Sequence, residues 1–228
     1  MEHAPSKAPA PKQSPILKRQ TVWENLWFYQ KAKALYGITF HFAHRFLSRG
    51  DRTIDQMIQA ARSGKQNIVE GSADGMTSTE MELKLLNVAR ASLKELREDY
   101  EDYLMARGLS QWDFHHPRYD RLLKFCRTRN RAEDYGEALL VTLSDEKIAN
   151  LAITLCHIVD RMMVSYLGAL QRRFTEEGGI RERMTAARLG YRNAQKEIIA
   201  ALQRDIAQLK EENRQLRNKL AALSDRET

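Results

Sequence analysis

Basic side chains gather in the stretch 161–196, where they could bind the phosphate groups of a nucleic acid. Eight basic residues occur there with three acidic ones, a local net charge of +5. Guanidinium groups bind phosphate oxygens, often in pairs, and the interspersed Phe174 and Tyr191 offer rings on which exposed bases can stack. The candidate phosphate ligands are Arg172, Arg173, Arg181, Arg183, Arg188 and Arg192.

A second candidate phosphate contact lies in the stretch 118–131. Lys124, Arg127 and Arg131 recur there at helical spacing, so one helix would place them on the same face. The alternative for both stretches is an ordinary solvated surface, because helical surfaces are commonly rich in arginine and the whole-chain excess is only +7. The two patches favour binding through phosphates and shape, without a motif that reads base sequence.

Residues typical of catalytic and metal sites occur without the spacing that their chemistry needs. The sequence contains no phosphate loop, dinucleotide fingerprint, nucleophile elbow or zinc-binding helix motif. His41 and His44 could share a helix face and hold a metal, but no third ligand stands at a telling distance. We therefore expect no enzymatic activity, no cofactor and no metal.

Two further clusters have a simpler structural explanation. One is acidic and consists of Glu95, Glu98, Asp99, Glu101 and Asp102. It could serve acid–base chemistry or a divalent cation, yet its members mostly fall off the apolar seam of their helix and suit a solvated face. The other is His115-His116 beside Trp112 and Arg118, which could form a small pocket, although a loop anchored by a buried Trp112 is the safer interpretation.

Composition limits the fold that can present these residues. Only 11 of 228 residues are Gly and 5 are Pro, and four of the prolines precede residue 16. An all-β sandwich or barrel would need glycine- and proline-rich turns throughout, so an all-helical fold is predicted. No apolar run approaches the roughly 18 residues of a membrane span and no signal-peptide core opens the sequence, which predicts a cytoplasmic protein. Cys126 and Cys156 are expected to be reduced thiols.

Hydrophobic periodicity predicts four long amphipathic helices, over about 23–47, 52–70, 77–107 and 144–178. Gly71 and Gly178-Gly179 would end the second and the fourth, Ser144 would cap the fourth, and Thr77 followed by Glu80 matches a capping box for the third. The expected architecture is an up-and-down four-helix bundle over 21–178. A helical insertion over 108–143, with short helices near 119–130 and 132–140, would connect the last two helices.

The segments outside the bundle differ in character. Residues 1–20 combine four prolines with basic residues and predict a disordered basic tail. A basic segment over 179–198 leads into a predicted leucine zipper over 199–224. Heptad position a holds Ile199, Ile206, Asn213 and Leu220, and position d holds Leu202, Leu209, Leu216 and Leu223. Isoleucine at a with leucine at d favours a parallel dimer, in which a buried Asn213 would set the register; the alternative is a helix that lies back along the bundle.

Two short motifs mark the segment 55–104: the helix end Asn67-Ile68-Val69-Glu70-Gly71 and the small-residue run Ala89-Arg90-Ala91-Ser92-Leu93-Lys94-Glu95-Leu96. With these motifs the segment resembles the four-helix-bundle family of the 23S rRNA-intervening-sequence proteins, whose superfamily includes the accessory variability determinant of diversity-generating retroelements. The resemblance extends over about 23–174, and residues 178–192 are similar to the C-terminal segment of the suffix subgroup. It implies a homo-oligomer, typically a pentamer, with a basic surface for nucleic acid and, in retroelements, a reverse transcriptase partner.

The zipper and the resemblance predict different assemblies. A dimeric zipper cannot satisfy five subunits within one ring, so it would join two rings, pair with another protein or become five-stranded. Within the motifs, Asn67 and Glu70 are expected to tie down the turn, and Ala89, Ala91 and Ser92 to allow close helix approach.

Residues and resemblance together predict a non-enzymatic oligomer that binds nucleic acid, with RNA as the first candidate. The alternative is a scaffold that docks a protein partner such as a reverse transcriptase, with no membrane association in either case.

Overall fold

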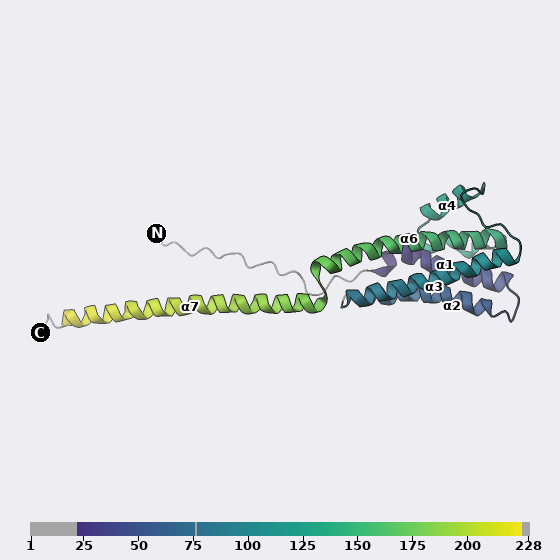
Figure 1. Cartoon of the computed structure of the whole chain (residues 1–228). Helices are drawn as coiled ribbons and strands as arrows, with labels where there is room; N and C mark the ends of the chain where they lie inside the picture. The colour runs from purple at the N-terminus through teal and green to yellow at the C-terminus, as the bar shows by residue number, and fades with distance from the viewer. Residues whose placement is uncertain (1–21, 76, 225–228) are drawn as a thin grey trace. The chain divides into compact units, whose positions relative to one another are not determined.

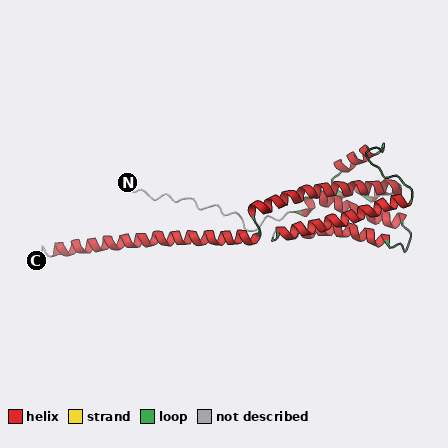
Figure 2. Cartoon of the chain, in the orientation of Figure 1, coloured by secondary structure: helices red, strands yellow, loops and turns green. Residues whose placement is uncertain are grey.

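The computed structural model describes residues 22–75 and 77–224, apart from the side chains of residues 177 and 222–224. Within these ranges all regular structure is helical, which confirms the all-helical prediction (Figure 2). The tail predicted for residues 1–20 lies outside the described residues. The chain divides into two compact units, with the boundary between Ile180 and Arg181.

Four long helices of the first unit pack on one another as a helical bundle. They are α1 (Trp27–Phe46), α2 (Thr53–Asp74), α3 (Thr79–Ala106) and α6 (Asp145–Glu177). Helix α1 contacts α2 and α6, and helix α3 contacts the same two helices. The four helices run alongside one another in Figure 1. Each of the four helices therefore has two others as its main neighbours.

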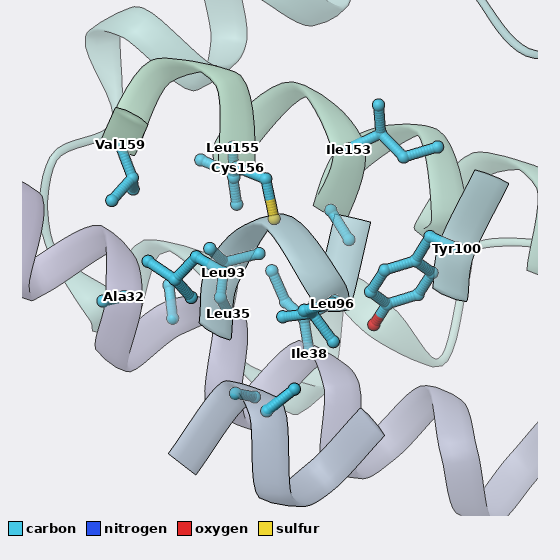
Figure 3. Close-up of a cluster of buried hydrophobic side chains, with 14 of the residues drawn as sticks. Ala32, Leu35, Ile38, Leu93, Leu96, Tyr100, Ile153, Leu155, Cys156 and Val159 are labelled. Atoms are coloured by element: carbon cyan, nitrogen blue, oxygen red, sulfur yellow. The ribbon is translucent and has the colours of Figure 1, made fainter. Parts of the chain in front are cut away.

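The core of this unit consists of residues three and four apart on each helix. Figure 3 shows this core, in which Ala32, Leu35 and Ile38 of α1, Leu93 and Leu96 of α3, and Leu155 and Val159 of α6 are at most 3% exposed. Burying a leucine or isoleucine side chain completely stabilises a fold by about 2 kcal/mol. The predicted amphipathic spacing is thus the spacing that fills the core. Cys126 and Cys156 are buried and free.

Polar side chains add specific links between the helices. The Tyr100 hydroxyl donates a hydrogen bond to Oγ1 of Thr39 at 3.0 Å, inside the core between α3 and α1. Nε of Arg90 lies 2.8 Å from Oδ1 of Asp160 and joins α3 to α6. These contacts satisfy polar groups that would otherwise be costly to bury.

The prediction that Gly71 ends the second helix is wrong, because α2 continues to Asp74. A Cβ at Gly71 would lie 3.3 Å from Cβ of Leu85 in α3, so this glycine serves close helix packing. Gly64 has the same role, since a Cβ there would lie 2.6 Å from Cδ2 of Leu93. Both glycines mark the α2–α3 contact and not a helix end.

The third helix begins one residue later than the predicted capping box. The hydroxyl oxygen of Ser78, and not that of Thr77, accepts a hydrogen bond from the backbone N–H of Met81 at 3.1 Å. The Thr77 hydroxyl instead donates to the carbonyl oxygen of Asp74 and holds the preceding turn. The predicted cap of the fourth helix is confirmed, since Ser144 accepts from the backbone N–H of Lys147.

The first helix also begins later than predicted. Residues Trp23–Asn25 form a short 3-10 helix, η1. Leu26 then adopts an extended backbone and packs against the core, so α1 starts at Trp27.

The predicted insertion contains α4 (Tyr119–Thr128), the 3-10 helix η2 (Ala132–Tyr135) and the single-turn helix α5 (Glu137–Leu140). The chain leaves α3 at Gly108, whose φ of +62° favours glycine. Helix α4 packs on α6, whereas η2 and α5 contact α1. The insertion therefore covers two of the bundle helices on their outer side.

The second unit contains α7 (Ile180–Ser224), a single helix of 45 residues, from its second residue onward. The predicted basic segment and the predicted zipper are consecutive parts of this one helix. The chain leaves α6 at Gly178, whose φ is +71°, as expected for a glycine that ends a helix.

One helical stretch is long and apolar enough to cross a membrane by length and composition alone. It is a window of mean hydropathy 1.3 within Asp145–Ala221. The expectation that no apolar run approaches this length was therefore too strict. Of this window 61% is buried inside the protein, as is usual for a core helix.

Candidate nucleic-acid interface

Four of the candidate phosphate ligands lie on α7. Arg181, Arg188 and Arg192 are exposed, while Arg183 is partly buried and its Nε has no hydrogen-bond partner among the described atoms. Spacings of seven and four residues place the three exposed arginines within about 40° of one another around the helix axis. They therefore form one basic face, which we call the α7 arginine face (Arg181, Arg188 and Arg192).

The other candidate ligands lie in the first unit. Arg172 and Arg173 are exposed near the end of α6, and Lys124 and Arg127 are exposed on α4. Arg131 does not share their helix, contrary to the prediction, because α4 ends at Thr128 and Arg131 has an extended backbone before η2. The stretch 161–196 is likewise divided between α6 and α7, which belong to different units.

A buried lysine accounts for the end of α4. Lys31 of α1 is only 1% exposed, and its Nζ donates to the carbonyl oxygens of Cys126 at 2.6 Å and Arg129 at 2.7 Å. A cation at a helix C-terminus also interacts favourably with the helix dipole. Burial lowers the pKa of Lys31 below its usual value. Tyr135 donates to the same Arg129 carbonyl at 2.8 Å, so the chain is held away from a further helical turn.

Sequence reasoning missed Lys31, although a signal was present. Lys31 lies three residues after Phe28 and four before Leu35, both of them buried. A lysine on the apolar face of a helix must have buried acceptors, and such acceptors can come only from another segment.

The candidate phosphate ligands are not used in ion pairs within the described part of the chain. The ion pairs there involve Lys33, Arg90, Arg97, Arg129 and Arg214. The candidate phosphate ligands are not among these residues, so their charges can act on a bound anion, as an anion-binding surface requires.

A cavity of about 370 Å³ lies between α4, α6 and the loop that precedes α4. The residues that matter most in its lining are Trp112, Phe114, Tyr119, Arg127, His157 and Arg161. Arg127 is a predicted phosphate ligand and Arg161 begins the predicted basic stretch 161–196, but the sequence pattern predicts no cavity beside them. The available signal was that the apolar face of α6 is wider than one seam, since Ile158 and Met162 pack at the edge of the core and also line the cavity.

Trp112 anchors the loop, as the sequence predicts. It is 8% exposed, its backbone N–H donates to Oδ1 of Asn150 at 2.6 Å, and its indole Nε1 donates to Oε1 of Glu146 at 2.7 Å. The His116 ring stacks on the indole at 4.8 Å with an interplanar angle of 5°. The anchored loop also forms one wall of the cavity, through Trp112. His115, His116 and Arg118 do not line it, so the pocket suggested for these residues is not the cavity that the structure shows.

His157, in the cavity lining, has a shifted pKa. Burial is the main cause that lowers this pKa; the charges of Arg97 and Arg161 lower it further, while those of Glu101 and Asp160 act in the opposite direction. A base whose protonated form is disfavoured in this way is neutral at pH 7.

The other predicted clusters do not converge on a metal or catalytic site. No group of three or more His, Cys, Asp or Glu side chains suited to a metal occurs among the described residues. His41 contacts Arg45, and His44 packs edge-on against Phe40 with ring centroids 4.5 Å apart.

The acidic cluster on α3 has three exposed members and two partly buried ones, Asp99 and Glu101, of which Glu101 pairs with Arg97 at 3.2 Å. Glu95, Glu98 and Asp102 are exposed, but Asp99 is half-buried. Burial, followed by the negative charges of Asp102, Glu95 and Glu98, raises the pKa of Asp99 to about 6. Asp99 is thus an electrostatically strained carboxyl group on an otherwise ordinary charged face.

The predicted zipper positions form an exposed apolar stripe on α7. Ile199, Leu202, Ile206, Leu209, Leu216 and Leu220 are each between 52% and 74% exposed. Oδ1 of Asn213 accepts a hydrogen bond from Nε of Arg217 at 3.1 Å. The side chain of Leu223 lies outside the described residues. A regular stripe of this kind on a single helix is typical of a surface that pairs with another helix.

Comparison with known proteins assigns neither a family nor a function to this chain. No family model, no curated protein and no solved structure matches the chain. The case for a function therefore rests on the residues of this chain.

Proposed function

We propose that this protein is a non-enzymatic oligomer that binds nucleic acid, with RNA as the first candidate, through arginine-rich helix surfaces. The observation that carries the proposal is that α7 combines an exposed arginine face with an exposed zipper stripe. One continuous helix can then supply both self-association and phosphate binding.

The two features of α7 also share a side of the helix. Arg192 lies seven residues before Ile199, which is the first residue at heptad position a of the zipper, so Arg192 also falls at position a. Arg188 and Arg181 lie fourteen and twenty-one residues before Leu202 and fall, like it, at position d. In a parallel pair the arginines of both helices would therefore meet just before the seam. Like charges would keep the helices apart there, leaving a cationic fork suited to a phosphate backbone.

We further propose that α1, α2, α3 and α6 form an up-and-down four-helix bundle of the type expected from the resemblance to the 23S rRNA-intervening-sequence proteins. Ala89 and Ser92 are buried within the resembling motif, and Gly64 and Gly71 allow α2 to approach α3 closely. The predicted role of Asn67 in the turn is not supported, since its Nδ2 donates to the carbonyl oxygen of Ser63 within α2. Two pentameric rings of bundles, joined by five dimeric zippers, would reconcile the two predicted assemblies.

The test compares two triple variants of equal charge by fluorescence anisotropy with labelled single-stranded RNA, duplex RNA and duplex DNA. Changing Arg181, Arg188 and Arg192 to Gln should weaken binding at least about tenfold and reduce the salt slope by about 2 to 3, since each phosphate contact contributes about 0.7 to 0.9. The control changes Arg204, Arg214 and Lys219, which lie outside the a and d positions, to Gln. Equal losses in both variants, or no binding by the wild type at low salt, would contradict the proposal.

The exposed zipper stripe also favours a second function, a scaffold that docks the helix of a protein partner such as a reverse transcriptase. In that case Leu209→Asp would abolish partner binding, while the arginine variant would retain it. Association of the purified chain with itself, lost in Leu209→Asp, would instead assign the stripe to self-pairing.

A further inference from the structure

The cavity between α4 and α6 has the composition of a binding site for a small aromatic anion. Its floor is apolar, with Leu123 of α4 and with Ile153 and Met162 of α6. Its volume of about 370 Å³ is in the range of small-molecule sites. It lies wholly within the first unit, so it is independent of the α7 arginine face.

The aromatic wall of the cavity consists of a fixed ring, that of Trp112, and an exposed ring, that of Phe114. Trp112 is fixed by its two hydrogen bonds and by the stacked His116 ring. Phe114 is 75% exposed at the mouth, where its ring contacts the neighbouring His115 ring with centroids 3.7 Å apart. An exposed phenylalanine at the rim of a cavity offers a face on which a planar ligand can stack.

Two cations from different helices line the same cavity. Arg127 comes from α4 and Arg161 from α6, and neither takes part in the ion pairs of the described residues. Asp113 is the one acidic residue in the described lining, and its Oδ1 accepts a hydrogen bond from the backbone N–H of His115 at 2.9 Å. The lining therefore carries a net positive charge and can hold a phosphate between two guanidinium groups.

We propose that this cavity binds a single nucleotide, with the base against Phe114 and the apolar floor and the phosphate between Arg127 and Arg161. A neutral apolar ligand would leave both arginines without a partner, and a simple inorganic anion would leave the aromatic wall unused. The nucleotide is either free in solution or the terminal nucleotide of a strand, since both present a base beside a phosphate monoester.

The test measures binding of adenosine 5′-monophosphate to the full chain by titration calorimetry, with adenosine and inorganic phosphate as separate probes. The nucleotide should bind at least about tenfold more tightly than either part, because each part makes only half of the contacts. Arg161→Gln and Phe114→Ala should each weaken nucleotide binding about tenfold, whereas Arg121→Gln on the exposed surface of α4 should not. Both test positions are exposed, so the variants are expected to fold.

Two RNA probes distinguish the source of the nucleotide. If a short RNA with a 5′-phosphate binds more tightly than the same RNA with a 5′-hydroxyl, and Arg161→Gln abolishes the difference, the ligand is a strand end. If the free nucleotide binds more tightly than either RNA, the ligand is a soluble nucleotide. Absence of nucleotide binding at about 1 mM with equal binding of the two RNAs would overturn the inference. Nucleotide binding that survives the triple change at Arg181, Arg188 and Arg192 separates this inference from the proposed function.

Discussion

Lys31 shows how one buried charge sets the position of a surface element. Its Nζ is the donor for two carbonyl oxygens at the end of α4, and that helix supplies one wall of the nucleotide cavity. The core of the bundle could be predicted from apolar spacing alone. The partners of Lys31 could not, because they lie 95 and 98 residues away and their position depends on how the insertion folds.

Lys31→Met should destabilise the protein by about 2 kcal/mol, because two carbonyl oxygens at the end of α4 lose their donor. The matched control is Lys33→Met, which removes an exposed lysine paired with Glu133 at 3.5 Å and should cost less than about 0.5 kcal/mol. Urea unfolding followed by circular dichroism gives both values. Equal effects of the two changes would contradict the role of Lys31.

Asp99 should make stability depend on pH in an unusual direction. Its pKa is raised from 3.8 to about 6, so the folded chain holds this proton more tightly than the unfolded chain. Stability from this group is present below about pH 4 and is lost as the pH rises through about 6. Asp99→Asn should therefore raise the unfolding free energy at pH 7.5 by about 1 kcal/mol, after allowance for solvent screening, and have little effect at pH 4.

The measurement is thermal or urea unfolding of both proteins across this pH range, with Glu70→Gln on the exposed face of α2 as the control. A gain that is the same at pH 4 and pH 7.5 would show that the substitution acts through packing and not through the charge of Asp99.

At the scale of elements, periodicity predicts which segments are helices, but glycine has two meanings that sequence cannot separate. Gly178 has a positive φ and ends α6, as predicted, whereas Gly71 lies inside α2 because its missing side chain admits α3. The difference arises from the neighbour across the helix contact and not from the flanking residues. The cavity is harder still to foresee, since its walls come from a loop and two helices that meet only in the fold.

Gly64 and Gly37 provide a matched test of this explanation. Gly64→Ala should cost about 1 to 3 kcal/mol, since the new Cβ would lie 2.6 Å from the Leu93 side chain and force it to shift. Gly37→Ala, in the middle of α1, has no atom within 4 Å of the new Cβ and should stabilise by about 0.5 to 1 kcal/mol through helix propensity. Denaturant midpoints give both signs, and a stabilising Gly64→Ala would refute the close α2–α3 contact.

At the scale of the whole molecule, the proposed assembly depends on the stripe of α7. If two copies of the stripe pair in parallel, Asn213 faces its counterpart inside the seam, where it sets the register at some cost in stability. Asn213→Leu should then raise the melting temperature and broaden the distribution of oligomer states. Light scattering coupled to size exclusion measures that distribution. An unchanged distribution would show that Asn213 does not lie in a seam between two copies of this helix.

The central claim is that a self-associated chain holds nucleic acid through its phosphates. It is tested most directly by the mass of the full chain, measured by light scattering coupled to size exclusion, with and without a short mixed-sequence RNA. We predict a mass of at least two 26.4 kDa chains, RNA co-eluting at about 50 mM salt, and its release at about 500 mM salt. A 26.4 kDa monomer that elutes free of RNA at low salt would contradict the claim.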